Sequence, residues 1–178
     1  MANEYPPLTE GDPESPVRVI TYEDLQCKDC AWFRRKLDDV ILPEFGGHVA
    51  FEHRDFPLVK HEWAREAAMA ARHFSTVGYG TAIAFRRTIL SEISIITKES
   101  LPEWVRDFAT DYGADPEAAE AALTDARLEA VIDADVASGK ERGIEKTPTV
   151  IVGNQSFVEW IQIEELSKAI ELEVERKR

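Results

Sequence analysis

The pattern of hydrophobic and polar positions predicts that strands and helices alternate in the first third of the chain. Residues 17–22 form a β-branched and largely apolar run, which is typical of a strand buried on both faces. From Cys27 onward, apolar residues recur at spacings of three and four, which predicts a helix that ends at Pro43 and Gly46-Gly47. A second strand is expected over residues 48–53. The first third therefore has a β–α–β pattern.

The middle of the chain lacks a convincing strand and is rich in helical periodicity. Three longer helices are expected, over residues 63–74, 82–93 and 101–108. The isoleucine-rich segment 90–96 can also be interpreted as a strand. Asp115-Pro116 predicts an N-cap followed by a proline at the first position of a short fourth helix. We interpret this block as a helical insertion whose aromatic and alanine stripes form its core.

The last third of the chain predicts an α–β–β–α order. A long helix is expected over residues 128–136, with its end between Gly139 and Gly143. Two apolar runs flank Gly153-Asn154, which is a strong signal for a β-hairpin. A final helix is expected over residues 163–174, where apolar residues recur at helical spacing.

The complete pattern indicates the α/β fold class with an all-helical unit inserted into it. Residues 1–16 contain four prolines and almost no apolar periodicity, so they predict an extended N-terminal arm. The predicted division is an arm over residues 1–16, a β–α–β half over 17–58, a helical insertion over 59–124 and an α–β–β–α half over 125–178.

Composition and charge limit the classes of partner. The chain has 178 residues, 44% of them hydrophobic, which is enough for one domain with a full core. It carries 21 Lys and Arg against 34 Asp and Glu, a formal charge of −13, so it should repel nucleic acids and anionic membranes. No run of eighteen apolar residues is present, so no stable membrane insertion is expected.

The start of the chain gives two expectations about its compartment. Residues 1–15 are polar and rich in proline, without the apolar core of a signal peptide. The chain as written is therefore expected to be cytoplasmic. The alternative is a periplasmic or other extracytoplasmic protein from which a leader has been removed.

The two cysteines of the chain, Cys27 and Cys30, form a C-x-x-C motif at the start of the first predicted helix. Only a thiolate attacks a disulfide, and the N-terminus of a helix favours a thiolate through its unpaired N–H groups and its dipole. Cys27 is the expected nucleophile and Cys30, one turn further in, the expected resolving thiol. Lys28 should favour the Cys27 thiolate and Asp29 should oppose it, so both are expected to tune the site.

The C-x-x-C motif has two structural alternatives. A structural disulfide that closes a four-residue loop gains little from cross-linking. Half of a zinc site needs a second ligand pair, and the four histidines of the chain show no matching spacing; they are His48, His53, His61 and His73. A redox-active dithiol is therefore favoured. It requires no metal and no cofactor, because the pair itself carries two electrons.

Four segments together resemble a known family. They are Gly-Asp-Pro-Glu-Ser-Pro-Val at 11–17, Asp-Leu-Gln-Cys-Lys-Asp-Cys at 24–30, Arg-Asp-Phe-Pro-Leu at 54–58, and Gly-Ile-Glu-Lys-Thr-Pro-Thr at 143–149. In this order and spacing, the chain resembles the DsbA-like thiol–disulfide oxidoreductases, a branch of the thioredoxin superfamily. The resemblance extends from about Gly11 to the end. It implies a thioredoxin-like fold with an inserted all-helical sub-domain.

The resemblance also implies a role for Thr147 and Pro148. In the family, the corresponding peptide bond is cis and its loop faces the dithiol, so that the Thr147 backbone can pair with an extended substrate peptide. The implied substrates are proteins or peptides that contain cysteine. A separate redox partner is implied as well, because the Cys27–Cys30 pair must be regenerated after each turnover.

Two positions depart from the family pattern. Many members carry a buried acid six residues before the first cysteine, where this chain has Thr21, which cannot take a charge. Glu23 and Asp24 lie nearby and are expected to belong to a solvated loop. The Lys28-Asp29 dipeptide also differs from the Pro-Tyr or Pro-His that is usual between the cysteines, so the direction of the reaction stays open.

Two other functions remain as hypotheses. A non-catalytic redox sensor or binding domain would keep the fold and change conformation with its oxidation state, without turnover. A glutathione-dependent enzyme of the related kappa-type transferase fold is the third hypothesis. Its chemistry does not need a second cysteine, so Cys30 argues against it.

Overall fold

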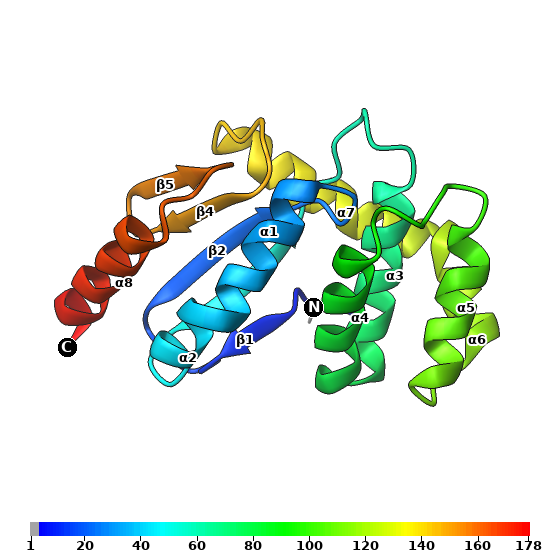
Figure 1. The fold of residues 1–178 in the computed structure, drawn as a ribbon, viewed down its shortest axis with the longest axis horizontal. Helices are drawn as coiled ribbons and strands as arrows, with labels where there is room; N and C mark the ends of the chain where they lie inside the picture. The colour runs from blue at the N-terminus through cyan, green and yellow to red at the C-terminus, as the bar shows by residue number, and fades with distance from the viewer. Residues whose placement is uncertain (1–3) are drawn as a thin grey trace.

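The protein, described here by a computed structural model over residues 4–178, is built on a five-stranded mixed sheet (Figure 1). The strands lie in the order β1 (Thr9–Gly11), β3 (Ala50–Asp55), β2 (Arg18–Glu23), β4 (Thr149–Val152) and β5 (Gln155–Val158). The central strands β2 and β3 are parallel, and the other neighbours are antiparallel. The α/β class predicted for the chain is therefore confirmed.

Helices cover both faces of the sheet (Figure 1). One face carries α1 (Lys28–Lys36), α2 (Leu42–Phe45) and α8 (Ile163–Lys177), and the other carries α7 (Ala126–Glu141). Val19 points to the first face, where it packs with Phe33, whereas Tyr22 points to the second and packs with Phe56. The prediction that this strand is buried on both faces is confirmed.

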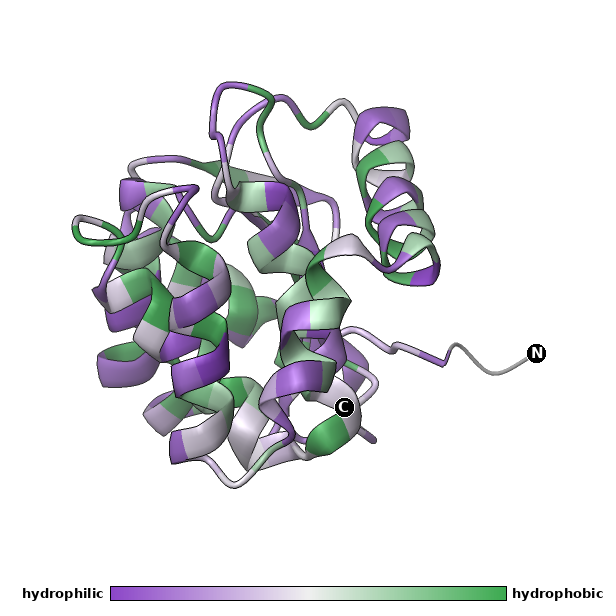
Figure 2. Ribbon diagram, turned by 90° about the vertical axis from the view of Figure 1, so that its right-hand side faces the viewer, coloured by the Kyte–Doolittle hydropathy of each residue, from purple (hydrophilic) through white to green (hydrophobic). Residues whose placement is uncertain are grey.

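Four helices follow β3 and lie beside the sheet (Figure 1). They are α3 (Ala64–Val77), α4 (Tyr79–Ser91), α5 (Leu101–Asp111) and α6 (Pro116–Ala121), followed by a 3-10 turn at Ala122–Thr124. Phe74, Phe85 and Phe108 meet in their centre, with ring centroids 4.8–5.1 Å apart. The helices alternate hydrophobic and hydrophilic residues, as a packed helical unit requires (Figure 2).

Two local features of this helical unit can be compared with the prediction, the N-cap at Asp115 and the segment 90–96. The Asp115 side chain caps α6 by accepting hydrogen bonds from the backbone N–H groups of Glu117 and Ala118. The alternative of a strand over residues 90–96 is wrong, because α4 continues to Ser91 and a turn follows.

The first helical segment ends at Gly46, as predicted, but Pro43 does not interrupt it. Pro43 does not end it but lies in the first turn of α2, after a π-helical segment at Leu37–Ile41. A proline has no N–H to donate to the preceding turn, so the hydrogen-bond pattern changes before it and the helix resumes. The first helical segment therefore reaches Phe45.

The N-terminal arm is the main correction to the predicted fold. Residues 1–3 lie outside the described part of the chain, but β1 pairs antiparallel with β3, and Tyr5 and Leu8 are buried. Within the predicted arm, Thr9–Gly11 is thus an edge strand of the sheet, which the sequence did not predict. The second predicted strand is also displaced, since β3 begins at Ala50 instead of residue 48. The edge strand β1 has only three residues, which is too short to show the alternation of hydrophobic and polar positions that predicts a strand.

Candidate active site

The cysteine pair lies where β2 passes into α1, at the carboxyl end of the strand. Cys27 is the N-cap of α1, and its backbone N–H donates to the Asp24 carbonyl at 3.1 Å. Both cysteines are free thiols. Cys27 is 7% exposed and Cys30 only 1%, so Cys27 is the more accessible sulfur, as predicted, although both are buried.

The two thiols have opposite pKa shifts. The pKa of Cys27 is lowered to about 6, chiefly because the Cys30 thiol hydrogen-bonds to it, and the backbone N–H groups of Cys30 and Asp29 add to the effect. Burial raises the pKa of Cys30 well above its usual range, and the neighbouring Cys27 raises it further. At neutral pH, Cys27 is therefore the thiolate and Cys30 the thiol.

The loop before β4 faces Cys27. The Thr147–Pro148 peptide bond is cis, as the family resemblance implies. The Cys27 sulfur lies 3.5 Å from the Thr147 carbonyl oxygen, to which it can donate a hydrogen bond while it is protonated. These two segments are 120 residues apart in the chain and form one side of the site together.

An open cleft of about 790 Å³ has Cys27 in its lining. Its apolar lining comes from Leu58, Val59 and Ile93, and Val59 is fully exposed. The charged lining residues carry both signs; they are Lys28, Asp29, Lys60, Glu145, Lys146 and Glu159. The histidine His61 also lines the cleft. Lys28 and Asp29 thus lie in the cleft, but the largest influence on the Cys27 pKa comes from Cys30 rather than from these two side chains.

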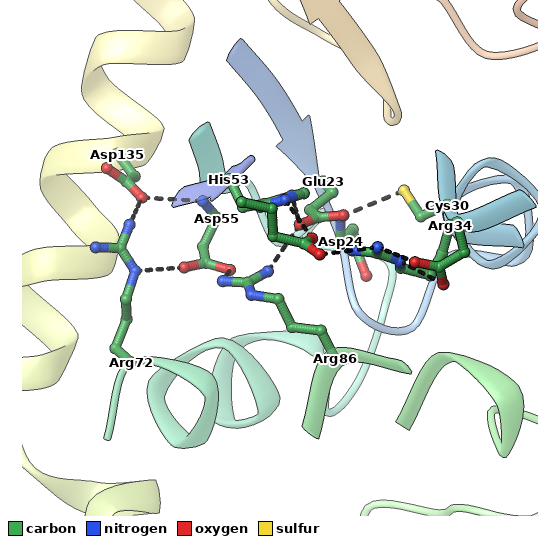
Figure 3. A network of polar contacts seen from close by, with 11 residues as sticks. Glu23, Asp24, Cys30, Arg34, His53, Asp55, Arg72, Arg86 and Asp135 are labelled. Atoms are coloured by element: carbon green, nitrogen blue, oxygen red, sulfur yellow. Dashed lines mark hydrogen bonds and ion pairs between the residues drawn. The ribbon is translucent and has the colours of Figure 1, made fainter. Parts of the chain in front are cut away.

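The prediction that Asp24 lies in a solvated loop is wrong. Its side chain is fully buried and accepts hydrogen bonds from the backbone N–H of Gln26 at 2.7 Å and of Leu58 at 2.8 Å. The Nδ1 atom of His61 lies 2.6 Å from the same carboxylate. The Asp24 N–H donates to the Cys30 sulfur at 3.4 Å, and Figure 3 shows these two residues. The segment after β3 folds over Asp24, which the sequence around Asp24 does not reveal.

Glu23 is also buried, so its assignment to a solvated loop is wrong as well. It is the last residue of β2 and contacts His53 at 2.9 Å and Arg86 at 2.8 Å. Burial raises the pKa of Glu23, but His53 and Arg86 outweigh this effect and lower it to about 2. Figure 3 shows how the network continues through Asp55 to Arg72. Thr21 lies buried in the same strand.

Within residues 4–178, no three His, Cys, Asp or Glu side chains gather in a group that could hold a metal ion. Among the same residues, no helix has the length and apolarity needed to cross a membrane.

The fold is shared with several solved structures. The thiol-disulfide exchange protein alpha-DsbA2 from Wolbachia pipientis is similar with a TM-score of 0.78 and 21% identity, over 94% of this chain and 86% of that one. For oxidised BdbD from Bacillus subtilis the TM-score is 0.80 with 20% identity, over 95% and 93%. For ScsC from Proteus mirabilis the values are 0.79 and 16%, over 98% and 75%. The expected resemblance to DsbA-type proteins is confirmed at the level of the fold.

The comparison with protein families covers nearly the whole chain. No curated protein matches it. A family model with the description thioredoxin matches residues 4–172, from the N-terminal segment to α8. This range includes the cysteine pair, the helical unit and the loop with the cis-proline. The chain therefore belongs to the thioredoxin family.

Proposed function

We propose that the protein is a thiol–disulfide oxidoreductase that exchanges its Cys27–Cys30 pair with cysteines of protein or peptide substrates. The observation that carries this proposal is the opposite pKa shift of two adjacent thiols at the start of α1. One sulfur is ready to attack near neutral pH, and the other stays protonated until the first has reacted.

The chemistry follows from this asymmetry. The Cys27 thiolate attacks one sulfur of a substrate disulfide, a mixed disulfide forms, and the other substrate sulfur leaves as a thiolate. Cys30 then loses its proton and attacks the Cys27 sulfur, which releases the second substrate sulfur. The pair is oxidised by two electrons and the substrate disulfide is reduced by two. The reverse sequence donates a disulfide.

Thr147 and Pro148 shape the substrate groove in this proposal. The Thr147 carbonyl lies beside the Cys27 sulfur, so an extended substrate segment can pair with this backbone while its cysteine faces Cys27. The apolar side chains of Leu58, Val59 and Ile93 offer contacts to the substrate residues on either side of that cysteine.

Donation of disulfides is the direction that the thiols support. A lowered pKa of the attacking cysteine stabilises the reduced pair, which makes the disulfide form more oxidising. The Cys27 pKa of about 6 lies between those of thioredoxin, about 7, and DsbA, about 3.5, so we expect a reduction potential between their values of about −270 mV and about −120 mV. Equilibration in graded glutathione buffers measures it. A strongly oxidising value supports an oxidising compartment and a separate partner that reoxidises the pair, whereas a strongly reducing value supports a reductase in the cytoplasm.

Substitution of each cysteine tests the roles directly. Cys27→Ser should abolish turnover of a peptide disulfide, because the attacking sulfur is gone. Cys30→Ser should accumulate mixed disulfides with the substrate, seen as a mass increase that a reductant reverses. Full activity of the Cys27 variant would overturn the proposal. A wild-type protein that changes conformation on oxidation, but shows no turnover, would identify a redox sensor instead.

A further inference from the structure

The two carboxylates that precede the cysteine pair have different surroundings. Glu23 is held by Arg86 and His53 inside the protein, away from the cleft. Asp24 instead contacts His61, a residue that lines the cleft together with Cys27. Of these two carboxylates, Asp24 is the one whose hydrogen bonds reach a titratable side chain that lines the cleft with Cys27.

The contact between Asp24 and His61 fixes the orientation of the imidazole. A carboxylate only accepts hydrogen bonds, so the Nδ1 atom, 2.6 Å away, carries the proton. The opposite edge of the ring carries Nε2, which has no hydrogen-bond partner within residues 4–178. The side chain of His61 is 20% exposed, whereas that of Asp24 is fully buried, so the ring reaches from a buried anchor into the cleft.

We infer that His61, oriented by Asp24, exchanges a proton with the substrate sulfur in the cleft. This inference rests on the proposed oxidoreductase function. When Cys27 attacks a substrate disulfide, the bond between Cys27 and one substrate sulfur forms, the substrate S–S bond breaks, and Nε2–H protonates the sulfur that leaves. Solvent in the open cleft restores the proton to His61. In the reverse reaction, neutral Nε2 takes the proton of the attacking substrate thiol. His61 is then a catalytic residue, and Asp24 is a positioning residue.

Other charged groups line the same cleft, and their effect on the pH dependence of the reaction rate has to be separated from that of His61. They are Lys28 and Asp29 on α1, Lys60 beside His61, Glu145 and Lys146 before the cis-proline, and Glu159 after β5. Lys146 and Glu159 form an ion pair at 2.9 Å. The attacking thiol lines the cleft as well, and the pKa of Cys27 is about 6, so the pH profiles have to be compared between variants that all keep Cys27.

The test is single-turnover reduction of a peptide disulfide by the reduced protein, followed from about pH 5 to about pH 8. His61→Gln should slow the reaction at neutral pH by roughly tenfold or more, since the leaving sulfur loses its proton donor. It should also change the shape of the pH profile of the rate, because one proton donor in the cleft is removed. His48→Gln is the matched control, because His48 is exposed and precedes β3, at the opposite end of that strand from the site. That variant should behave as the wild type.

Two further variants separate proton transfer from a structural role. His61→Gly should recover activity when imidazole is added. Asp24→Asn should change the pH profile of the rate although His61 is intact. A uniform loss at every pH without rescue by imidazole would show that His61 only supports the loop, and overturns the inference. Equal rates of His61→Gln and wild type at all pH values also overturn it, while the proposed function stands. Exchange that persists in Cys27→Ser overturns the proposed function itself, and this inference with it.

Discussion

Cys27 and Cys30 are one helical turn apart, yet their environments separate their protonation states. Cys27 receives hydrogen bonds from the Cys30 thiol and from backbone N–H groups at the start of α1. Cys30 packs in the apolar cluster of the helical unit, where a charge is unfavourable. The asymmetry needed for disulfide exchange therefore comes from burial and hydrogen bonding within one turn.

The lowered pKa of Cys27 should depend on the Cys30 side chain. Alkylation of the wild type should follow a titration near pH 6, the pKa of Cys27. Cys30→Ala should raise this pKa because it removes the largest stabilising hydrogen bond, whereas Cys30→Ser keeps a donor and should raise it less. The rate of alkylation by iodoacetamide as a function of pH measures all three. Identical titrations in the alanine variant and the wild type would contradict the assignment.

At the scale of elements, α7 packs closely against the sheet at Gly139. Gly139 of α7 faces the rings of Phe56 and Tyr22, and a Cβ at Gly139 would lie 2.7 Å from the Phe56 ring and 3.1 Å from Tyr22. Phe56 belongs to the segment that leads into the cleft. Close approach of the helix to the strand therefore requires a residue without a side chain at this position.

Gly139→Ala should lower the stability of the protein in spite of the better helix propensity of alanine. Overpacking costs about 1–3 kcal/mol and propensity returns about 1 kcal/mol, so we expect a net loss of about 1 kcal/mol. Gly80→Ala in α4 is the matched control, because nothing lies within 4 Å of the added Cβ. It should be neutral or slightly stabilising. Urea unfolding measures both, and equal effects would show that the α7 contact adapts without cost.

At the scale of the whole molecule, a buried ionic network joins the helical unit to the sheet (Figure 3). Arg72 of α3 and Arg86 of α4 both contact the Asp55 carboxylate at the end of β3, at 2.6 and 2.8 Å. Arg72 also contacts Asp135 of α7, and Arg86 contacts Glu23. We propose that residues 59–124 form a helical insertion that this network fixes in orientation beside the active site.

Loss of one cation from this network should destabilise the protein strongly. Arg86→Met leaves Glu23 and Asp55 buried with fewer partners, so we expect a loss of about 3–5 kcal/mol in the free energy of unfolding. The exposed pair between Arg106 and Glu120 provides a control, since Arg106→Met should cost no more than about 1 kcal/mol. Chemical unfolding followed by circular dichroism compares them. Similar losses of unfolding free energy in both variants would contradict a structural role for the network.

The same network should make the protein sensitive to acid. The pKa of Glu23 is about 2 in the folded protein, against about 4.3 for an ordinary glutamate in the unfolded chain. The stability that this difference contributes is present above about pH 4.3 and is lost as the pH falls toward about 2. His53 and Arg34 lower the pKa of Glu10 in the same direction, while burial raises that of Asp135.

Urea unfolding between about pH 5 and about pH 2 should show this loss. Glu23→Gln should be less stable at neutral pH and should lose less stability on acidification, because its side chain does not titrate. A wild type that keeps its full stability at about pH 2 would be incompatible with an ionised Glu23 in the folded core.

The sequence by itself determined the features whose signals lie within one or two turns of chain. These features include the cysteine pair at a strand–helix junction, the helices that follow β3, the cap at Asp115 and the hairpin around Gly153. Their spacing and turn chemistry act locally, so the pattern of residues is sufficient to predict them. The role of Pro148 came from similarity of motifs, because the local sequence does not distinguish a cis from a trans bond.

Only the tertiary structure decided which polar groups are buried and which meet at the site. β1 exists because β3 offers a free edge, and Asp24 is buried because the segment around Leu58 folds over it. His61 enters the cleft for the same reason, although it lies 37 residues from the carboxylate that orients it. Such contacts join segments that are far apart in the chain, and neither periodicity nor residue type near one partner carries information about the other.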